Sequence, residues 1–418
     1  MGIDVTFIGL FIANTIACAV YSILAPYLPT EANARGINSF IVGLMLAGYP
    51  LTAFISSLLL GKYLGKFGKR RVLVFGCSCE MFSTLGYSLL PFLPIEYFLI
   101  LGFTLRLFQG LGAGCIGTST YSLIVANYPN EIQKYLGILN ISSALGFMAG
   151  PVGASMLFAI GGFSLIYITF GLLNLLLIPM VYCLIDKDIY SLMGEHDITS
   201  LDLIKNSIIR DYFFVLIISS ISMCFISPTY SLHLQSFNIS DNLFGLIFAL
   251  PTVSFIASIY FVINNSWGHK RLFLSGIIIL IIANLTIGPW EYLYLPHSIY
   301  ISLIGIFILG IGICFIYLSA LPEAISKSHY EFSNYPKDYI SDLVSGLANS
   351  FSFMAEMVAP PCSGYLRDHF GFENAQALLA GATFVCLLYL INSPRLVDSL
   401  KTKIESTEMA EITETLKS

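Results

Sequence analysis

Three ionisable side chains of this 418-residue chain, Glu80, Arg106 and Glu356, fall inside long apolar segments. A charge inside such a segment is costly, so a charged residue that is kept there is a candidate for function. Glu80 lies nine residues after Arg71, which is about 13 Å along a helix. A carboxyl group at that depth is a candidate to take up and release protons. A protonated packing residue is the alternative reading of Glu80.

Arg106 and Gln109 are three residues apart, so they lie on one face of a helix, next to Gly110 and Gly114. A buried guanidinium keeps its charge and needs an acid or a carbonyl group as its partner. If that partner gained or lost a proton, its pairing with Arg106 would change, and the conformation of the protein with it. Arg106 and Gln109 are therefore candidates for proton coupling. A clamp on backbone carbonyl groups is the structural alternative.

Glu356 follows Asn349 by seven residues, so the two side chains lie two helical turns apart on nearly the same face. Glu356 is a candidate to supply negative charge to a bound molecule, with a protonated structural acid as the alternative. Glu31 and Glu323 lie near the ends of two apolar segments, where a carboxylate would attract a cation to either mouth of a pore. Ordinary solvated carboxylates are the alternative for this second pair.

The composition places these residues in an integral membrane protein. The chain is 56% hydrophobic and only 11% charged, whereas soluble domains carry about a quarter charged residues. Its apolar segments approach the ~20 residues that a helix needs to cross a bilayer, so we expect an all-α protein with twelve transmembrane helices. They are residues 5–26, 39–61, 72–92, 97–126, 135–160, 163–185, 212–234, 242–263, 272–288, 299–321, 343–365 and 376–392.

A polar connection divides these segments into six before it and six after it. We expect a first bundle at residues 1–185, a cytosolic linker at 186–211, a second bundle at 212–393 and a disordered cytosolic tail at 394–418. All but three of the 20 Lys and Arg residues fall on the side that would hold both termini, which predicts that both termini are cytosolic. The first segment lacks the basic leader and cleavage site of a signal peptide, so we expect it to be retained.

The fifth apolar segment places Gly146 and Gly150 one helical turn apart, directly before Pro151. The glycines clear one face for the backbone of a neighbouring helix, and the proline invites a bend, which suits a moving joint. Plain close packing is the alternative. A shift of 209 residues superimposes the second half of the chain on the first, as in several transporter architectures. The matched pairs include Gly346 with Gly137 and Pro360 with Pro151.

These features resemble the major facilitator superfamily, and the resemblance spans essentially the whole chain. Three stretches carry it: GKYLGKFGKRR resembles the first cytosolic-loop signature, RLFQGLGAG the signature of the fourth helix, and GILNISSALGFMAGPVGAS the antiporter signature. The resemblance implies alternating access between two six-helix halves, with conformational roles for residues of these motifs. They are Gly61, Gly65, Gly68, Arg71, Gly137, Gly146, Gly150 and Pro151, with Pro360 in the second half.

Within the superfamily the chain resembles the vesicular amine carriers, and most of all their polyamine branch. The stretches concerned are YSILAPYLPTEANARG, SPTYSLHLQSFNIS, LPEAI and LVSGLANSFSF. This resemblance implies exchange of protons for an organic cation, with Arg106 in a coupling role and with Glu31 and Glu323 matching acids of that branch. One tyrosine on each helix that lines the cavity in this family is a candidate for cation–π contact, with packing as the alternative. These are Tyr21, Tyr121, Tyr230 and Tyr317.

Some positions depart from the family pattern. The loop signature normally carries an Asp that locks the cytosolic side, and Gly65 occupies its place. Ala154 and Ser155 replace the terminal Gly-Gly of the antiporter signature. Asn349 aligns with a functional Asp of the monoamine and acetylcholine carriers, and the first apolar segment has no acid where monoamine carriers use one. These departures argue against assuming a monoamine substrate.

The sequence therefore predicts a secondary active transporter, a proton-coupled antiporter of an organic cation such as a polyamine or monoamine. An exporter or facilitator of a neutral or anionic solute stays open, as does a receptor or assembly subunit on a transporter scaffold. Without a nucleophile elbow, phosphate-binding loop or metal-ligand spacing, we expect no enzyme activity, cofactor, metal or nucleic-acid partner. The expected partners are the lipid bilayer, a small organic solute and protons, with the protein a monomer in an intracellular vesicle or plasma membrane.

Overall fold

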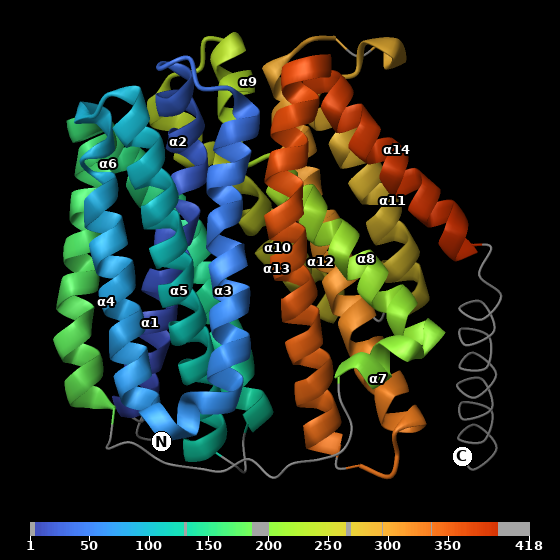
Figure 1. Ribbon diagram of the computed structural model, residues 1–418. Coiled ribbons are helices and arrows are strands. Elements are labelled where there is room, and N and C mark those ends of the chain that lie inside the picture. Colours follow the sequence, from blue (N-terminus) through green and yellow to red (C-terminus); the bar gives the residue numbers. More distant parts are fainter. Residues whose placement is uncertain are drawn as a thin grey trace.

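The computed structural model shows a bundle of long helices in two groups (Figure 1). Every regular element of the described part of the chain is helical, which confirms the all-α class. The tail that begins at residue 394 lies outside that part. The structure describes residues 5–128, 132–185, 200–264, 269–294, 296–335 and 337–391.

The first group of helices comes from the first half of the chain. Its longest helix, α6, has 53 residues and is broken at Gly161 and Gly162. Gly162 adopts a positive φ of 66°, which a side chain would disfavour, so the fifth and sixth predicted spans turn into each other here. The elements are α1 (Val5–Ser22), α2 (Leu24–Asn33), α3 (Ser39–Phe67), α4 (Lys69–Tyr87), η1 (Leu90–Phe92), α5 (Ile95–Asn127) and α6 (Ile132–Leu184).

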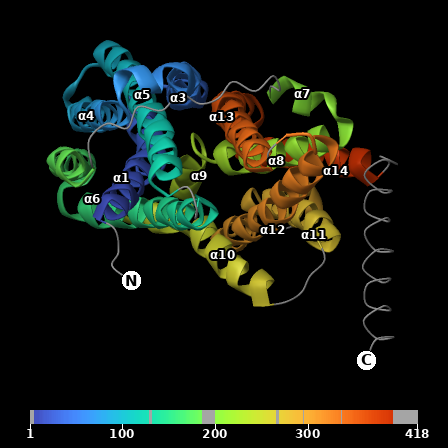
Figure 2. The same ribbon diagram turned by 90° about the horizontal axis from the view of Figure 1, so that it is seen from below.

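The second group repeats this arrangement beside the first, as the view along the bundle shows (Figure 2). Its first span is broken: α8 and α9 meet at an angle of 44°. The elements are α7 (Ser200–Lys205), α8 (Ser207–Phe225), α9 (Tyr230–Ser236), η2 (Asp241–Leu243), α10 (Phe244–Asn264), α11 (His269–Ile287), η3 (Glu291–Leu293), α12 (Ile299–Glu331), α13 (Lys337–Phe370) and α14 (Phe372–Ile391).

The helices account for the predicted twelve spans. Within the described residues, eight helices are long and apolar enough to cross a membrane, and nine when the bent pair α8 and α9 counts as one span. The other predicted spans are the second arm of α6, the shorter apolar α11, and α13, which carries Glu356. The twelve-helix layout predicted from apolar length is therefore confirmed.

Several predicted boundaries were wrong in detail. The loop expected after the second span is reduced to Gly68, with φ 88°, because α3 runs on to Phe67 and α4 begins at Lys69. The first span continues past Pro26 as α2, which ends at Asn33. The expected linker contains α7 and the first turn of α8, so helical structure begins before residue 212. The apolar pattern could not predict these extensions, because a helix end outside the membrane needs no apolar side chains and is made of polar residues.

The two halves touch at the face that carries the connection between α2 and α3, called here the upper face (Figure 1). There Gly43 of α3 lies against the carbonyl group of Pro360 on α13, and Gly245 of α10 lies against the carbonyl group of Pro151 on α6. The two contacts are pseudo-equivalent, since each joins a glycine of one half to a proline of the other. Missing Cβ atoms let the backbones approach this closely.

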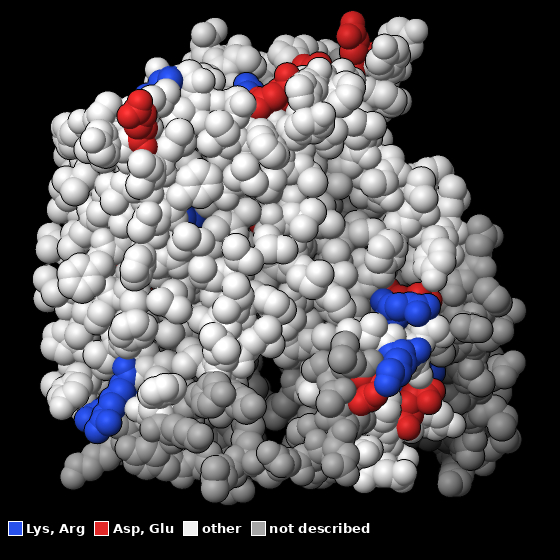
Figure 3. All heavy atoms as spheres, viewed as in Figure 1, with Lys and Arg blue, Asp and Glu red and all other residues white. Residues whose placement is uncertain are grey.

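Hydrogen bonds reinforce both contacts. Arg367 donates to the hydroxyl of Ser39 at 2.6 Å, and the carboxylate of Asp368 accepts from the backbone N–H of Phe40 at 3.0 Å. On the other side, the hydroxyl of Ser155 accepts from the backbone N–H of Leu246 at 3.1 Å. At the opposite, lower face the space-filling view is hollowed between the halves (Figure 3). The contacts between the halves named here therefore lie at the upper face, and the hollow lies toward the lower one.

Candidate functional site

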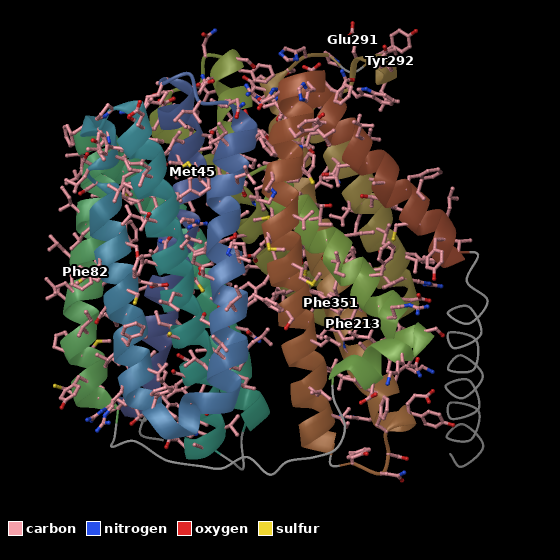
Figure 4. All side chains as sticks on the ribbon, viewed as in Figure 1. Met45, Phe82, Phe213, Glu291, Tyr292 and Phe351 are labelled. Carbon is pink, nitrogen blue, oxygen red and sulfur yellow. The ribbon has the colours of Figure 1, made fainter. Side chains whose placement is uncertain are left out.

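Five side chains from four helices meet midway between the two faces and form what we call the central cluster. Tyr21 lies on α1, Tyr49 on α3, Arg106 and Gln109 on α5, and Glu356 on α13. Met45, labelled in Figure 4, marks the turn of α3 before Tyr49. Since α1, α3 and α5 belong to the first half and α13 to the second, the cluster bridges the two halves.

The bridge itself is a hydrogen bond between Tyr21 and Glu356. The Tyr21 hydroxyl donates to a carboxyl oxygen of Glu356 at 3.3 Å. The Tyr21 ring lies 4.7 Å from the Tyr49 ring and 5.9 Å from that of Phe147, measured between centroids. Glu356 therefore faces a wall of aromatic rings on the opposite half, which is an arrangement that can hold a cation.

Arg106 lies against the same rings and is almost fully buried, with 3% of its surface exposed. Its guanidinium carbon is 4.6 Å from the centroid of the Tyr49 ring and 5.3 Å from that of Tyr21. It donates to the Gln109 side-chain oxygen at 2.6 Å and to the Leu46 carbonyl oxygen at 3.4 Å. The structure thus pairs this guanidinium with an amide, a carbonyl group and two rings.

Glu80 is buried in a different place, between α4 and α5 of the first half. It is fully buried, and neither carboxyl oxygen has a hydrogen-bond partner among the described residues. A Cβ atom built on Gly112 would lie 3.1 Å from Glu80 Cγ, so the glycine makes room for the acid. Among the described residues no hydrogen bond joins Glu80 to Arg106 or Gln109, the other two candidates for proton coupling.

Comparison with known proteins identifies the family of the chain. The family model of the Major Facilitator Superfamily matches residues 10–193 and 212–416. The chain belongs to this superfamily. It is similar to the MFS-type transporter SLC18B1 of Rattus norvegicus, at 27% identity over 402 residues that cover 93% of this chain and 87% of the relative.

Two further comparisons show how widely the superfamily fold is shared. The multi-drug resistance efflux pump PmrA of Streptococcus pneumoniae is 25% identical over 398 residues, which cover 90% of this chain and 93% of the pump. The structure of the nucleoside transporter NupG is similar with a TM-score of 0.70 and 14% identity, covering 92% of this chain and 98% of NupG. The resemblance to the superfamily and to the polyamine branch of the vesicular amine carriers is confirmed, and the chain is a multi-pass membrane transporter.

The tyrosines that the superfamily resemblance singled out lie in different surroundings. Only Tyr21 joins the central cluster. Tyr230 is fully buried in the second half, where its hydroxyl hydrogen-bonds that of Ser302 at 3.1 Å. Tyr121 is 36% exposed on α5, and the Tyr317 hydroxyl hydrogen-bonds that of Ser352 at 3.2 Å.

The remaining acids lie in other surroundings than the central cluster. Glu31 pairs with Arg35 at 2.6 Å, so its charge is compensated rather than offered to solvent. Glu323 is buried near the end of α12, with 6% of its surface exposed. The side chain of Asn349 lies outside the described residues; its backbone belongs to α13.

The motif residues of the superfamily lie in different surroundings. Gly146 and Gly150 lie against α1, with the Ala19 carbonyl oxygen 2.6 Å from a Cβ built on Gly150. This is the close approach that their spacing predicts. A Cβ on Gly137 would meet open space. Of the residues of the first-loop motif, Gly61 and Gly65 lie within α3, and Arg71 is exposed in the first turn of α4.

Sequence reasoning missed three residues of this region: Tyr49, Phe147 and Ser352. The sequence does not set Tyr49 apart among the 24 tyrosines. In the structure, Gly110 of α5 lies against the Tyr49 carbonyl group. Ser352 lies on α13 between Asn349 and Glu356 and one turn from the acid, so the helical spacing that linked those two would also have found it.

Proposed function

We propose that this transporter exchanges protons for an organic cation, such as a polyamine or monoamine, with Glu356 as the exchanging carboxyl group. The observation that carries the proposal is the hydrogen bond of 3.3 Å between Tyr21 and Glu356. It places the acid of one half against the aromatic rings of the other. A cation bound there would contact both halves, as alternating access requires.

Antiport follows from competition for one carboxyl group. Glu356 binds either a proton or the cation, so binding of one releases the other. The contact between Glu356 and Tyr21 differs between the protonated form and the cation-bound form. Arg106 supplies the coupling, because its guanidinium already lies against the rings of Tyr21 and Tyr49 and repels a second cation. Substrate entry therefore depends on the negative charge of Glu356.

The proposal also fixes an orientation. With both termini cytosolic, the hollowed lower face is turned toward the cytosol and the upper face, where the halves touch, toward a vesicle lumen or the outside. Cations would then be loaded from the cytosol and exchanged for protons from an acidic compartment. A single chain contains both halves of the central cluster, which suits a monomer.

Uptake into proteoliposomes tests the proposal. Liposomes with an acidic interior are offered radiolabelled spermidine, serotonin or an uncharged control, with and without a protonophore. Accumulation of an amine that the protonophore abolishes is the expected result. Folded protein that accumulates none of the amines would overturn the assignment.

One observation favours a second candidate, an exporter or facilitator of a neutral solute. Arg106 and Glu356 flank the same Tyr21 side chain, so their formal charges balance at the site. A balanced site suits a neutral or zwitterionic molecule as well as a cation. Flux of an uncharged solute that ignores the protonophore would support this candidate.

A further inference from the structure

A chain of three hydroxyl groups lies in the second half, where α8, α12 and α13 meet. The Tyr317 hydroxyl of α12 is 3.2 Å from the Ser352 hydroxyl of α13, which is 3.4 Å from the Ser220 hydroxyl of α8. Several other serines of these helices, such as Ser219 and Ser319, donate to a carbonyl group of their own helix. Ser220 and Ser352 instead hydrogen-bond side chains of neighbouring helices.

The hydroxyl chain has a fixed position relative to Glu356. Ser352 precedes Glu356 by four residues on α13, so both share one helix face and lie about 6 Å apart along the axis. Ser352 lies on the side of Glu356 that is nearer the hollowed lower face, because α13 rises from Lys337 to the upper-face contacts at Arg367. Phe351 and Phe213, labelled in Figure 4, pack with their ring centroids 5.3 Å apart and their planes tilted by 48°, so this turn lies against α8.

The chemistry of the chain is that of an adaptable neutral binding group. A hydroxyl donates one hydrogen bond and accepts two, so three linked hydroxyls keep one free donor and several free acceptor positions. Ser352 and Tyr317 are only half-buried, which leaves part of each accessible. A polar group arriving from the lower face would replace one internal hydrogen bond with one of its own.

We propose that Ser220, Tyr317 and Ser352 form a second, neutral subsite for a polar group of the substrate. The inference rests on the proposed function, with the cationic nitrogen at Glu356. The class of substrate is an organic cation that carries a hydroxyl or second nitrogen at a short linker's distance from that nitrogen, because Ser352 and Glu356 lie one turn apart on α13. Simple alkylamines of the same length satisfy only the first subsite.

Competition against uptake of a labelled amine tests the subsite with two nearly isosteric probes. 4-Amino-1-butanol carries both groups, whereas n-pentylamine replaces the hydroxyl by a methyl group. Wild-type protein is expected to favour the amino alcohol by about fivefold, as one hydrogen bond provides. Ser352→Ala and Tyr317→Phe should bring the ratio of the two inhibition constants close to one. Ser350→Ala is the matched control, since the Ser350 hydroxyl donates to its own helix at Gly346, and it should keep the wild-type ratio.

The outcomes separate the subsite from the proposed function. Amine accumulation without a difference between the two probes, or an unchanged ratio in both variants, overturns the subsite alone. Failure of the folded wild-type protein to accumulate any amine overturns the proposed function and the subsite with it. Thermal melting of each purified variant shows whether a lost ratio comes from lost folding.

Discussion

Glu80 and Glu356 are both carboxyl groups deep within the bundle, yet the structure treats them differently. Glu356 receives a hydrogen bond from Tyr21 of the other half. Glu80 is fully buried between helices of one half, and its oxygens have no hydrogen-bond partner among the described residues. Both residues were candidates because they lie deep in apolar segments. Glu356 lies between the halves, so its surroundings change when the halves move, whereas those of Glu80 do not.

The difference teaches where coupling can reside in this fold. Contacts within one half stay together when two rigid halves rock, whereas contacts between halves must break and re-form. Tyr21 and Glu356 form a contact of the second kind at mid-depth, and Ser155 with Leu246 forms one at the upper face. A ligand that alters such contacts has a differential affinity for the two states, which is what shifts their populations.

The largest effect is expected from Glu356→Gln. The substitution keeps the shape and removes the negative charge and the titrating proton, so accumulation of amine should fall by about a hundredfold or more. Uptake into acidic proteoliposomes measures it. Glu96→Gln, at an exposed acid in the first turn of α5, is the control and should transport normally. Undiminished uptake by the Gln variant would remove Glu356 from the mechanism.

Arg106→Gln should separate binding from coupling. Removing the guanidinium leaves the rings of Tyr21 and Tyr49 free for the substrate cation, so equilibrium amine binding should be retained or tightened. Proton-driven accumulation should fall about tenfold, because the competing charge that links protonation to binding is gone. Binding and accumulation are measured on the same preparation. Weaker binding with normal coupling would contradict the role assigned to Arg106.

Tyr21→Phe tests the bridge between the halves more gently. The ring and its cation–π contact are kept, and only the hydroxyl that donates to Glu356 is lost, so amine affinity should fall by about fivefold. Tyr230→Phe is the matched control, since its hydroxyl bonds Ser302 within the second half, and it should lower the melting temperature without changing affinity. Equal losses of affinity in both variants would show that the bridge has no special role.

The sequence was sufficient for the layout and for only part of the site. Apolar length predicted twelve spans, and the spacing of Gly146 and Gly150 predicted the close approach of α1, because both depend on neighbours within a helix or on one helix face. The family resemblance made Tyr21 a candidate, but its pairing with Glu356 could not be predicted, since the two residues are 335 positions apart in the sequence. The 209-residue duplication placed Pro151 and Pro360 in equivalent positions, but their glycine partners on α10 and α3 appear only in three dimensions.

The smallest effect on transport is expected from Glu80→Gln, which completes the comparison. No hydrogen bond joins Glu80 to the central cluster among the described residues, so amine affinity should be unchanged and accumulation should stay within about twofold of wild type. Glu80→Leu should raise stability by on the order of 1 kcal/mol, because an apolar side chain removes a buried polar group that has no partner. Uptake and thermal melting measured side by side check both statements. If the Gln variant still bound amine but lost proton-driven uptake, Glu80 would instead be a proton carrier. Proton coupling would then involve the interior of the first half as well as the contact between the halves.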